Sequence, residues 1–179
     1  MSFLASCATR EPLPNFFLLT GSRPRAQSSG GTSVLVRRVQ VPAYLARNNL
    51  VTIKGGMEVQ YAPTDRWAES LDQGLARAVA EDLSRNSRIR AYGFSPGAPP
   101  VDHSYDVWIR LEHFEGNDNG EVVLSARWSV SSADSSEPIK RGAVDLRQSG
   151  WKPGDYPGLV HMLSDEVKKM SLQIAEAIP

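Results

Sequence analysis

One stretch of the chain alternates apolar and polar residues so regularly that it leaves little freedom in the choice of secondary structure. The apolar residues of its first half are Tyr105, Val107, Ile109 and Leu111. Those of its second half, after the turn-forming residues 116–120, are Val122, Leu124, Ala126, Trp128 and Val130. A period of two places alternate side chains on opposite faces of a strand, so we predict an antiparallel hairpin with one buried face.

Shorter apolar segments predict further strands around this hairpin. Residues 139–146 are expected to add a third strand to the meander, residues 88–92 another strand, and residues 16–19 a buried one. Residues 50–53 and 57–61 flank Lys-Gly-Gly, which predicts a second hairpin. In residues 33–41 the apolar parity switches, which indicates either a bulge or a strand covered on both faces. Residues 42–45 are expected to start a turn or a short helical piece.

Two amphipathic helices are predicted, one in the middle of the chain and one at its end. Thr64 or Asp65 is expected to cap the first, which should end near Asn86. Its apolar stripe is Trp67, Leu71, Leu75, Val79 and Leu83. The second is expected to open at Asp155 and Pro157. Its stripe is Leu159, Leu163, Val167, Met170, Ile174 and Ile178. One stripe per helix means that each packs on the sheet, so we expect an α/β fold with a mixed, largely antiparallel sheet.

The composition agrees with one globular domain. The chain has 179 residues, of which 41% are hydrophobic and 22% are charged. No apolar run reaches the roughly 20 residues that a transmembrane helix needs. We expect a single domain over residues 15–179, preceded by residues 1–14 as the remnant of a truncated lipoprotein signal and a tether.

The single cysteine, Cys7, follows Leu4, Ala5 and Ser6. An apolar residue and two small residues before a cysteine are typical of the site at which a bacterial lipoprotein is cleaved and lipidated. Residues 1–6 supply only the tail of such a signal. The alternative is a free structural cysteine near a frayed terminus. With one cysteine there is no internal disulfide and no cysteine-based zinc site.

Charge is distributed unevenly, although the net charge is zero. Residues 8–57 hold seven basic residues and one acidic residue, and the rest holds 13 basic and 19 acidic residues. A basic region beside a lipid anchor can attract anionic headgroups, or it can simply be a solvated face. Nucleic acid is not expected as a partner, because there is no dense basic stripe interleaved with aromatic residues.

The motifs of enzymes are missing from the sequence. There is no nucleophile elbow, no phosphate-binding glycine loop and no paired-histidine zinc motif. His103, His113 and His161 stand apart, and we interpret His113, on the buried parity of its strand, as a satisfied, partly buried histidine rather than a catalytic one. The adjacent carboxylates of residues 81–82 and 165–166 point in different directions on a helix. We therefore expect no catalytic residue, no cofactor and no metal.

Tryptophan is frequent for a chain of this size. Trp67 and Trp128 lie on apolar stripes and are predicted to be core residues. Trp108 has the opposite parity from Val107 and Ile109. Either a helix covers that face as well, which is the interpretation we favour, or Trp108 marks an interaction patch.

Several segments together resemble a known family. They are residues 39–45 (Val-Gln-Val-Pro-Ala-Tyr-Leu), 50–51 (Leu-Val), 58–61 (Glu-Val-Gln-Tyr), 65–71 (Asp-Arg-Trp-Ala-Glu-Ser-Leu) and 80–83 (Ala-Glu-Asp-Leu). Their order and spacing resemble the ABC-type transport auxiliary lipoprotein family, and the likeness extends from Cys7 to the last predicted helix. Ser70 stands where the family usually has proline.

The resemblance implies a non-enzymatic lipoprotein that works with an MCE-domain (mammalian cell entry) transporter to move lipids or other hydrophobic molecules across the bacterial envelope. It implies a lipid such as palmitate on Cys7, and a fold similar to the N-terminal domain of TolB. Ala8, rather than aspartate, follows Cys7, which favours the periplasmic face of the outer membrane. Other possibilities are a soluble periplasmic module with an apolar ligand between helix and sheet, and a hydrolase built around the histidines.

Self-association is also expected, because exposed strand edges must be covered or paired. The family resemblance suggests a ring. We expect the contacts to involve Tyr44, Leu45 and the surrounding turn.

Overall fold

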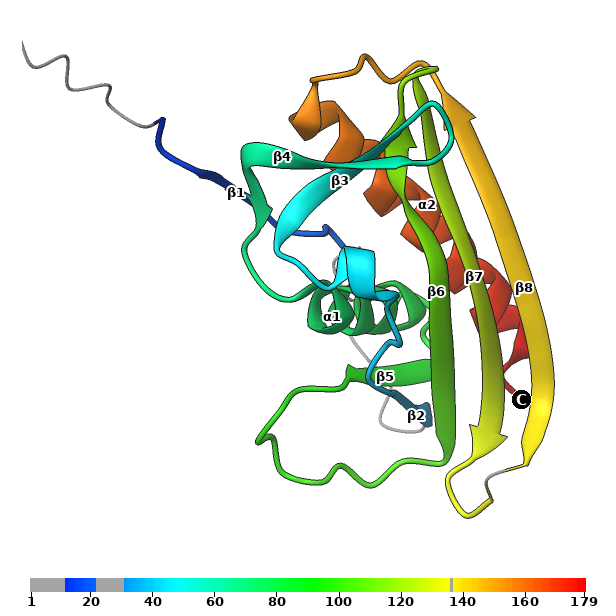
Figure 1. The fold of residues 1–179 in the computed structure, drawn as a ribbon. Helices are drawn as coiled ribbons and strands as arrows, with labels where there is room; N and C mark the ends of the chain where they lie inside the picture. Colours follow the sequence, from blue (N-terminus) through cyan, green and yellow to red (C-terminus); the bar gives the residue numbers. More distant parts are fainter. Residues whose placement is uncertain (1–11, 22–30, 136) are drawn as a thin grey trace, which may run out of the picture.

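The protein was analysed as a computed structural model, which describes residues 12–21, 31–135 and 137–179. Along the chain the elements are β1 (Asn15–Phe17), β2 (Thr32–Val36), the 3-10 turn η1 (Ala43–Leu45), β3 (Asn49–Lys54), β4 (Glu58–Trp67), α1 (Leu71–Leu83), β5 (Ile89–Gly93), β6 (Tyr105–Asn117), β7 (Glu121–Ser132), β8 (Pro138–Ser149) and α2 (Tyr156–Ala177) (Figure 1). In the part of the chain that the structure describes, neither helix has the length and apolar character needed to cross a membrane.

Eight described strands form one mixed sheet around β6. On one side of β6, β7 and then β8 add an antiparallel meander. On the other side, β2 pairs in parallel with the first part of β6 and β3 with its last part. β5 continues from β2, while β4 and β1 continue from β3. The predicted α/β class, with a mixed sheet and two helices, is confirmed.

The parity switch in residues 33–41 reflects a break in a strand. β2 ends at Val36, and Gln40 pairs again with β6 as an isolated bridge to Arg110. Val36 and Val39 are both buried, with 0% and 2% of their surface exposed. Of the two alternatives, the structure shows the irregular, bulge-like one.

A bulge between Leu111 and His113 changes the direction of side chains along β6. Before it, Val107, Ile109 and Leu111 are buried, as predicted. After it, Phe114 takes the buried position and His113 turns outward, with its side chain 57% exposed. The prediction that His113 has the buried parity and is partly buried was therefore wrong, because one extra residue reverses the parity.

The first helix begins later than predicted. Thr64, Asp65 and Trp67 belong to β4, and Ser70 occupies the N-cap position of α1. Asp65 pairs in register with Asn15 of β1 and accepts a hydrogen bond from its amide at 3.0 Å. Trp67 is 5% exposed, so it is a core residue, but it reaches the core from a strand. The remaining stripe from Leu71 to Leu83 is buried as predicted.

Helix α2 follows its sequence signals closely. The Asp155 carboxylate accepts a hydrogen bond from the Gly158 N–H at 3.0 Å, and Pro157 lies in the first turn. Five residues of the predicted stripe are fully buried: Leu159, Leu163, Val167, Met170 and Ile174. They pack on β7, β8 and β6, and against α1.

The strand predicted at residues 16–19 is short and largely exposed. Phe16 is 62% exposed and Leu18 is 50% exposed, whereas Leu19 is buried. β1 is an edge strand that pairs only with β4 among the described residues. An edge strand without a second neighbour leaves part of its surface in solvent, which explains the difference from the prediction.

Candidate functional site

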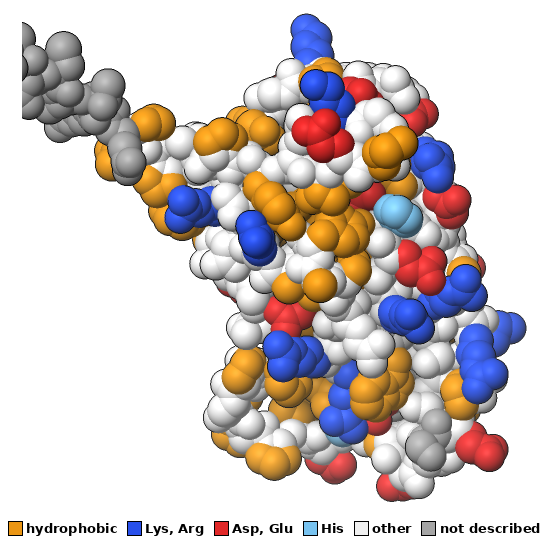
Figure 2. All heavy atoms as spheres, in the orientation of Figure 1, with side chains coloured by type: hydrophobic (Ala, Val, Ile, Leu, Met, Phe, Trp, Pro, Cys, Tyr) orange, Lys and Arg blue, Asp and Glu red, His pale blue; other side chains and the backbone are white. Residues whose placement is uncertain are grey.

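The two faces of the β6–β7–β8 meander differ in what covers them. Helix α2 packs against one face, and we name the opposite face the outer face. Figure 1 shows α2 behind these strands, so the view of Figure 2 looks onto the outer face. Its side chains are mostly charged or polar, and arginine and lysine groups gather over the strands.

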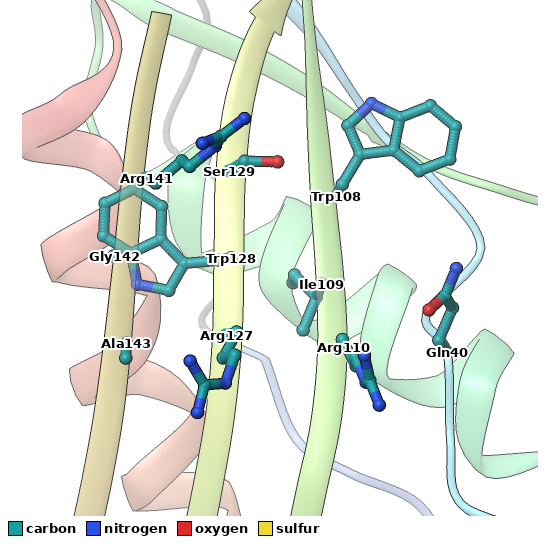
Figure 3. Close-up of a pocket in the computed structure, with 10 residues that line it drawn as sticks. All are labelled: Gln40, Trp108, Ile109, Arg110, Arg127, Trp128, Ser129, Arg141, Gly142 and Ala143. Carbon is teal, nitrogen blue, oxygen red and sulfur yellow. The ribbon is translucent and has the colours of Figure 1, made fainter. Parts of the chain in front are cut away.

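A depression of about 440 Å³ lies on the outer face, and we name it the arginine cup. Its side chains come from the outward parity of three adjacent strands and from the chain after β2: Gln40, Trp108, Arg110, Arg127, Ser129, Arg141 and Ala143. Figure 3 shows Trp108 and Arg141 on opposite sides of Ser129, with Arg110 on β6 and Arg127 on β7 farther along the strands and their guanidinium groups apart. The small Ser129 and Ala143 leave space between these long side chains, which hollows an otherwise flat sheet.

Trp108 is held in its position by a chain of charged contacts. The guanidinium of Arg37 lies over the indole, 5.4 Å from the ring centroid. Arg37 in turn donates two hydrogen bonds to Asp106, at 2.7 and 3.0 Å. Asp106 is only 4% exposed, and its Oδ1 also lies 3.0 Å from His103 Nε2. Trp108 itself is 44% exposed, so the helix-covered face that we favoured was wrong.

Glu112, the residue at the bulge, contributes the carboxylate beside the cup. Arg127 Nε donates to it at 2.8 Å, and Ser125 at 3.4 Å. The hydrogen bond from Arg127 is the main reason that the pKa of Glu112 lies below its usual value, and Arg110 adds to the effect. The same contact raises the pKa of Arg127. Two guanidinium groups, those of Arg127 and Arg110, therefore act on one carboxylate.

A second polar cluster lies beyond the bulge. Glu115 is 3% exposed and accepts hydrogen bonds from the Tyr44 hydroxyl at 2.9 Å and the Phe114 N–H at 2.6 Å. His113 Nδ1 lies 2.7 Å from its other oxygen. Burial, and then the negative charge of Glu115 and its hydrogen bond, raise the pKa of Tyr44 far above its usual value. The cluster fixes η1 against β6.

The β3–β4 hairpin crosses the outer face above this cluster (Figure 1). Beneath it is a groove of about 320 Å³, the hairpin groove, whose apolar wall includes Ile53, Met57 and Val59. Met57 is 87% exposed at the turn. Gly55 and Gly56 have φ of 58° and 75°, which glycine adopts without strain.

The histidines do not converge on one site. His103 contacts Asp106, His113 contacts Glu115, and His161 lies on the exposed side of α2, 3.8 Å from Asp165. Among the described residues, no group of three or more histidine, cysteine, aspartate or glutamate side chains is placed to hold a metal ion.

Comparison with known proteins agrees with the fold and the sequence pattern. A sequence model of the ABC-type transport auxiliary lipoprotein component matches residues 17–175. The chain belongs to this family. The intermembrane transport lipoprotein PqiC of Escherichia coli (strain K12) is 26% identical over 181 residues, which cover 98% of this chain and 92% of PqiC. The Shigella flexneri protein of the same name matches to the same extent.

Two solved structures have the fold of this family member. A crystal structure of an uncharacterized protein has a TM-score of 0.77 at 22% identity, and it covers 94% of this chain and 100% of its own. A Xanthomonas campestris protein has a TM-score of 0.72 at 12% identity, and it covers 90% of this chain and 92% of its own. These likenesses support the fold only.

The candidate residues of this auxiliary lipoprotein fall in different environments. Tyr44 and Trp108 both face the outer side of the meander, at the hairpin groove and the arginine cup. Leu45 is 2% exposed and lies in the hydrophobic core, so its side chain is not at a surface. Cys7 lies outside the described residues. Interaction through Tyr44 and Trp108 stays a prediction.

The arginine cup was missed by sequence reasoning. Arg110, Arg127 and Arg141 are far apart in the sequence, and only the register of β6, β7 and β8 brings them together. A signal was present, because each has the outward parity of a predicted strand.

Proposed function

We propose that this chain is a lipoprotein anchored through Cys7 to the periplasmic face of the outer membrane. There it assists an MCE-domain transporter that moves lipids or other hydrophobic molecules between the membranes. The family match over residues 17–175 carries this proposal. It is supported by the PqiC relatives, which are named intermembrane transport lipoproteins and align with 98% of the chain.

The packing of the core favours the proposed function over the alternative, a soluble module that holds its ligand between helix and sheet. Side chains fill the layer between helices and sheet. Leu75, Leu124 and Leu163 are each at most 1% exposed there. A function exerted through surfaces fits this packing.

The roles of the buried carboxylates support a non-enzymatic function. Asp106 holds Arg37, and Glu115 holds Tyr44 and the backbone of Phe114. Both have structural partners, and the histidines beside them, His103 and His113, lie on different parts of the sheet. We therefore assign no catalytic role to either pair.

Oligomerisation is part of the proposal. β8 has twelve residues, and among the described strands it pairs only with β7. A long unpaired edge is a template for association unless it is protected or covered. A homo-oligomer would bury such an edge, and its mass is measurable by light scattering on the purified protein. A monomer at all concentrations would contradict this part.

The lipid anchor is tested by metabolic labelling of the gene expressed with its own export signal. We expect the wild type and Ala8→Ser, a neutral change next to the site, to incorporate labelled palmitate. Cys7→Ala should incorporate none and should leave the membrane fraction. Label that persists in Cys7→Ala would overturn the proposed anchor.

The partner is tested by affinity purification from detergent-solubilised envelopes, with quantitative comparison against an unrelated outer-membrane lipoprotein. An MCE-domain protein enriched with this chain alone is the expected result. Equal recovery of MCE-domain protein in both samples would contradict the proposed partner.

A further inference from the structure

We propose that the arginine cup binds the phosphate of a lipid headgroup. The proposal rests on the proposed function, since a lipid-transport system presents such headgroups to its components. The cup supplies cationic donors on a face that no described helix covers, and guanidinium groups bind phosphate oxygens in a bidentate geometry.

The register of the meander brings like charges together. Arg110 of β6 lies directly opposite Arg127 of β7, and Ser129 of β7 lies opposite Arg141 of β8. Like charges at directly opposed positions of a sheet destabilise it. Glu112 offsets part of the repulsion between Arg110 and Arg127, and an anion between the guanidinium groups would offset more of it.

Two of the three arginines lack a direct hydrogen bond or ion pair. Arg127 donates to Glu112, whereas Arg110 and Arg141 make no hydrogen bond or ion pair with another described residue, although Arg110 helps to lower the pKa of Glu112. The arginines just outside the cup are neutralised, Arg37 by Asp106 and Arg38 by Asp72. The cup therefore holds positive charge that no described carboxylate pairs with directly, and an anion can use it.

The remaining wall suits the part of a headgroup that joins the phosphate to its acyl chains. The exposed indole of Trp108 offers an apolar surface beside the cationic groups, and Arg37 and Asp106 hold it in place without closing the cup. Gln40 and Ser129 add neutral donors. An aromatic ring with one apolar and one wet side is the usual residue at such a boundary.

The size of the cup favours a headgroup over an extended acidic peptide. Its side chains come from three adjacent strands, which span about 10 Å at the usual strand spacing of about 4.8 Å. Its volume of about 440 Å³ lies within the range of small-molecule sites, roughly 300–1,000 Å³. A peptide strand would extend beyond the three arginines onto a surface of mixed charge.

Binding is tested on the purified protein by calorimetry with dihexanoyl phosphatidylglycerol, used below its micelle concentration. Glycerol phosphate and a glutamate-rich peptide serve as competing probes. We expect the short-chain lipid to bind and each arginine lost from the cup to weaken it by about tenfold. The variants are Arg110→Gln, Arg141→Gln and their combination. Each variant is first checked by thermal unfolding, so that a folding defect is not scored as lost binding.

Lys140→Gln is the matched control, because it removes one positive charge from the residue next to Arg141 but on the opposite parity. It should change the affinity less than about twofold. Four results would overturn the proposal: no binding of the lipid, equal binding of glycerol phosphate, tighter binding of the peptide, or equal weakening by Lys140→Gln. These results leave the palmitate test of Cys7 untouched, so failure of the cup and failure of the proposed function are distinguishable.

Discussion

The inner and outer faces of the β6–β7–β8 meander belong to the same three strands but differ in polarity and in what covers them. The inner face is apolar and lies under α2, with Leu124, Val130 and Ile109 almost completely buried. The outer face carries arginines, two buried carboxylates and two depressions. The inner face stabilises the fold through burial of apolar area, and the outer face holds its shape through hydrogen bonds to Asp106 and Glu115.

The bulge in β6 keeps this division intact along a strand of 13 residues. Without it, His113 would face the helices and Phe114 the solvent, if the alternation before Leu111 continued. With it, Phe114 is 2% exposed and Glu115 lies on the side of Tyr44, whose hydroxyl donates to it. The bulge thus lies between the part of β6 that lines the arginine cup and the part that carries Glu115.

The largest effect is expected from an apolar deletion on the inner face. Leu124→Ala removes a fully buried side chain between β7 and the helices. We expect the free energy of unfolding to fall by about 2–5 kcal/mol, because apolar contacts are lost and a cavity is left. Urea denaturation measures the change. The neighbouring Ser125→Ala, on the outer face, should stay within about 0.5 kcal/mol. Equal losses would mean that the two faces do not differ as described.

A methyl group added to the inner face should also destabilise the protein. The Trp128 indole covers Gly142, and a Cβ at position 142 would overlap its ring atoms. We expect Gly142→Ala to cost about 1–3 kcal/mol, with a lower melting temperature. Ala143→Ser adds one atom to the next residue, which faces the outer side, and it should be nearly neutral. A neutral Gly142→Ala would show that the indole has room to move.

Local patterns predicted the elements that depend on neighbours in the sequence. The meander, the second hairpin and the apolar stripes of both helices follow from periods of 2 and 3.6 residues. The later start of α1 did not, because β4 continues to Trp67 by pairing with β1, about fifty positions earlier in the chain. Periodicity carries no information about a partner at that distance.

The candidate site was harder to predict than the fold. Trp108 was recognisable from its parity, but its exposure depends on α2 packing on only one face. Leu45 was assigned to a contact surface together with Tyr44 and the surrounding turn, yet a short 3-10 turn directs these two neighbours differently. The cup forms only in the observed register of β6, β7 and β8, and this register could not be predicted from the sequence.

Removing the charge of the Glu115 carboxylate on the outer face should lower the stability of the protein. Glu115→Gln keeps the shape of the buried side chain but replaces charge-assisted hydrogen bonds from Tyr44 and Phe114 with weaker neutral ones. We expect a loss of about 1 kcal/mol in the free energy of unfolding. Glu121→Gln, an exchange at a more accessible carboxylate, is the control and should be close to neutral. If both variants matched the wild type, Glu115 would not hold the turn.

The smallest effect concerns alkaline pH and belongs to the outer face alone. Burial and Glu115 raise the pKa of Tyr44, so the folded protein keeps this proton where the unfolded chain, with a tyrosine pKa of about 10, loses it. The unfolded state then binds fewer protons, and the free energy of unfolding falls as pH rises above about 10. Because Tyr44 is only half-buried and solvent screens it, the slope should stay below about 1.4 kcal/mol per pH unit. Urea denaturation between about pH 8 and 11 should show a shallower decline for Tyr44→Phe than for the wild type. Parallel curves would mean that another group sets the alkaline limit.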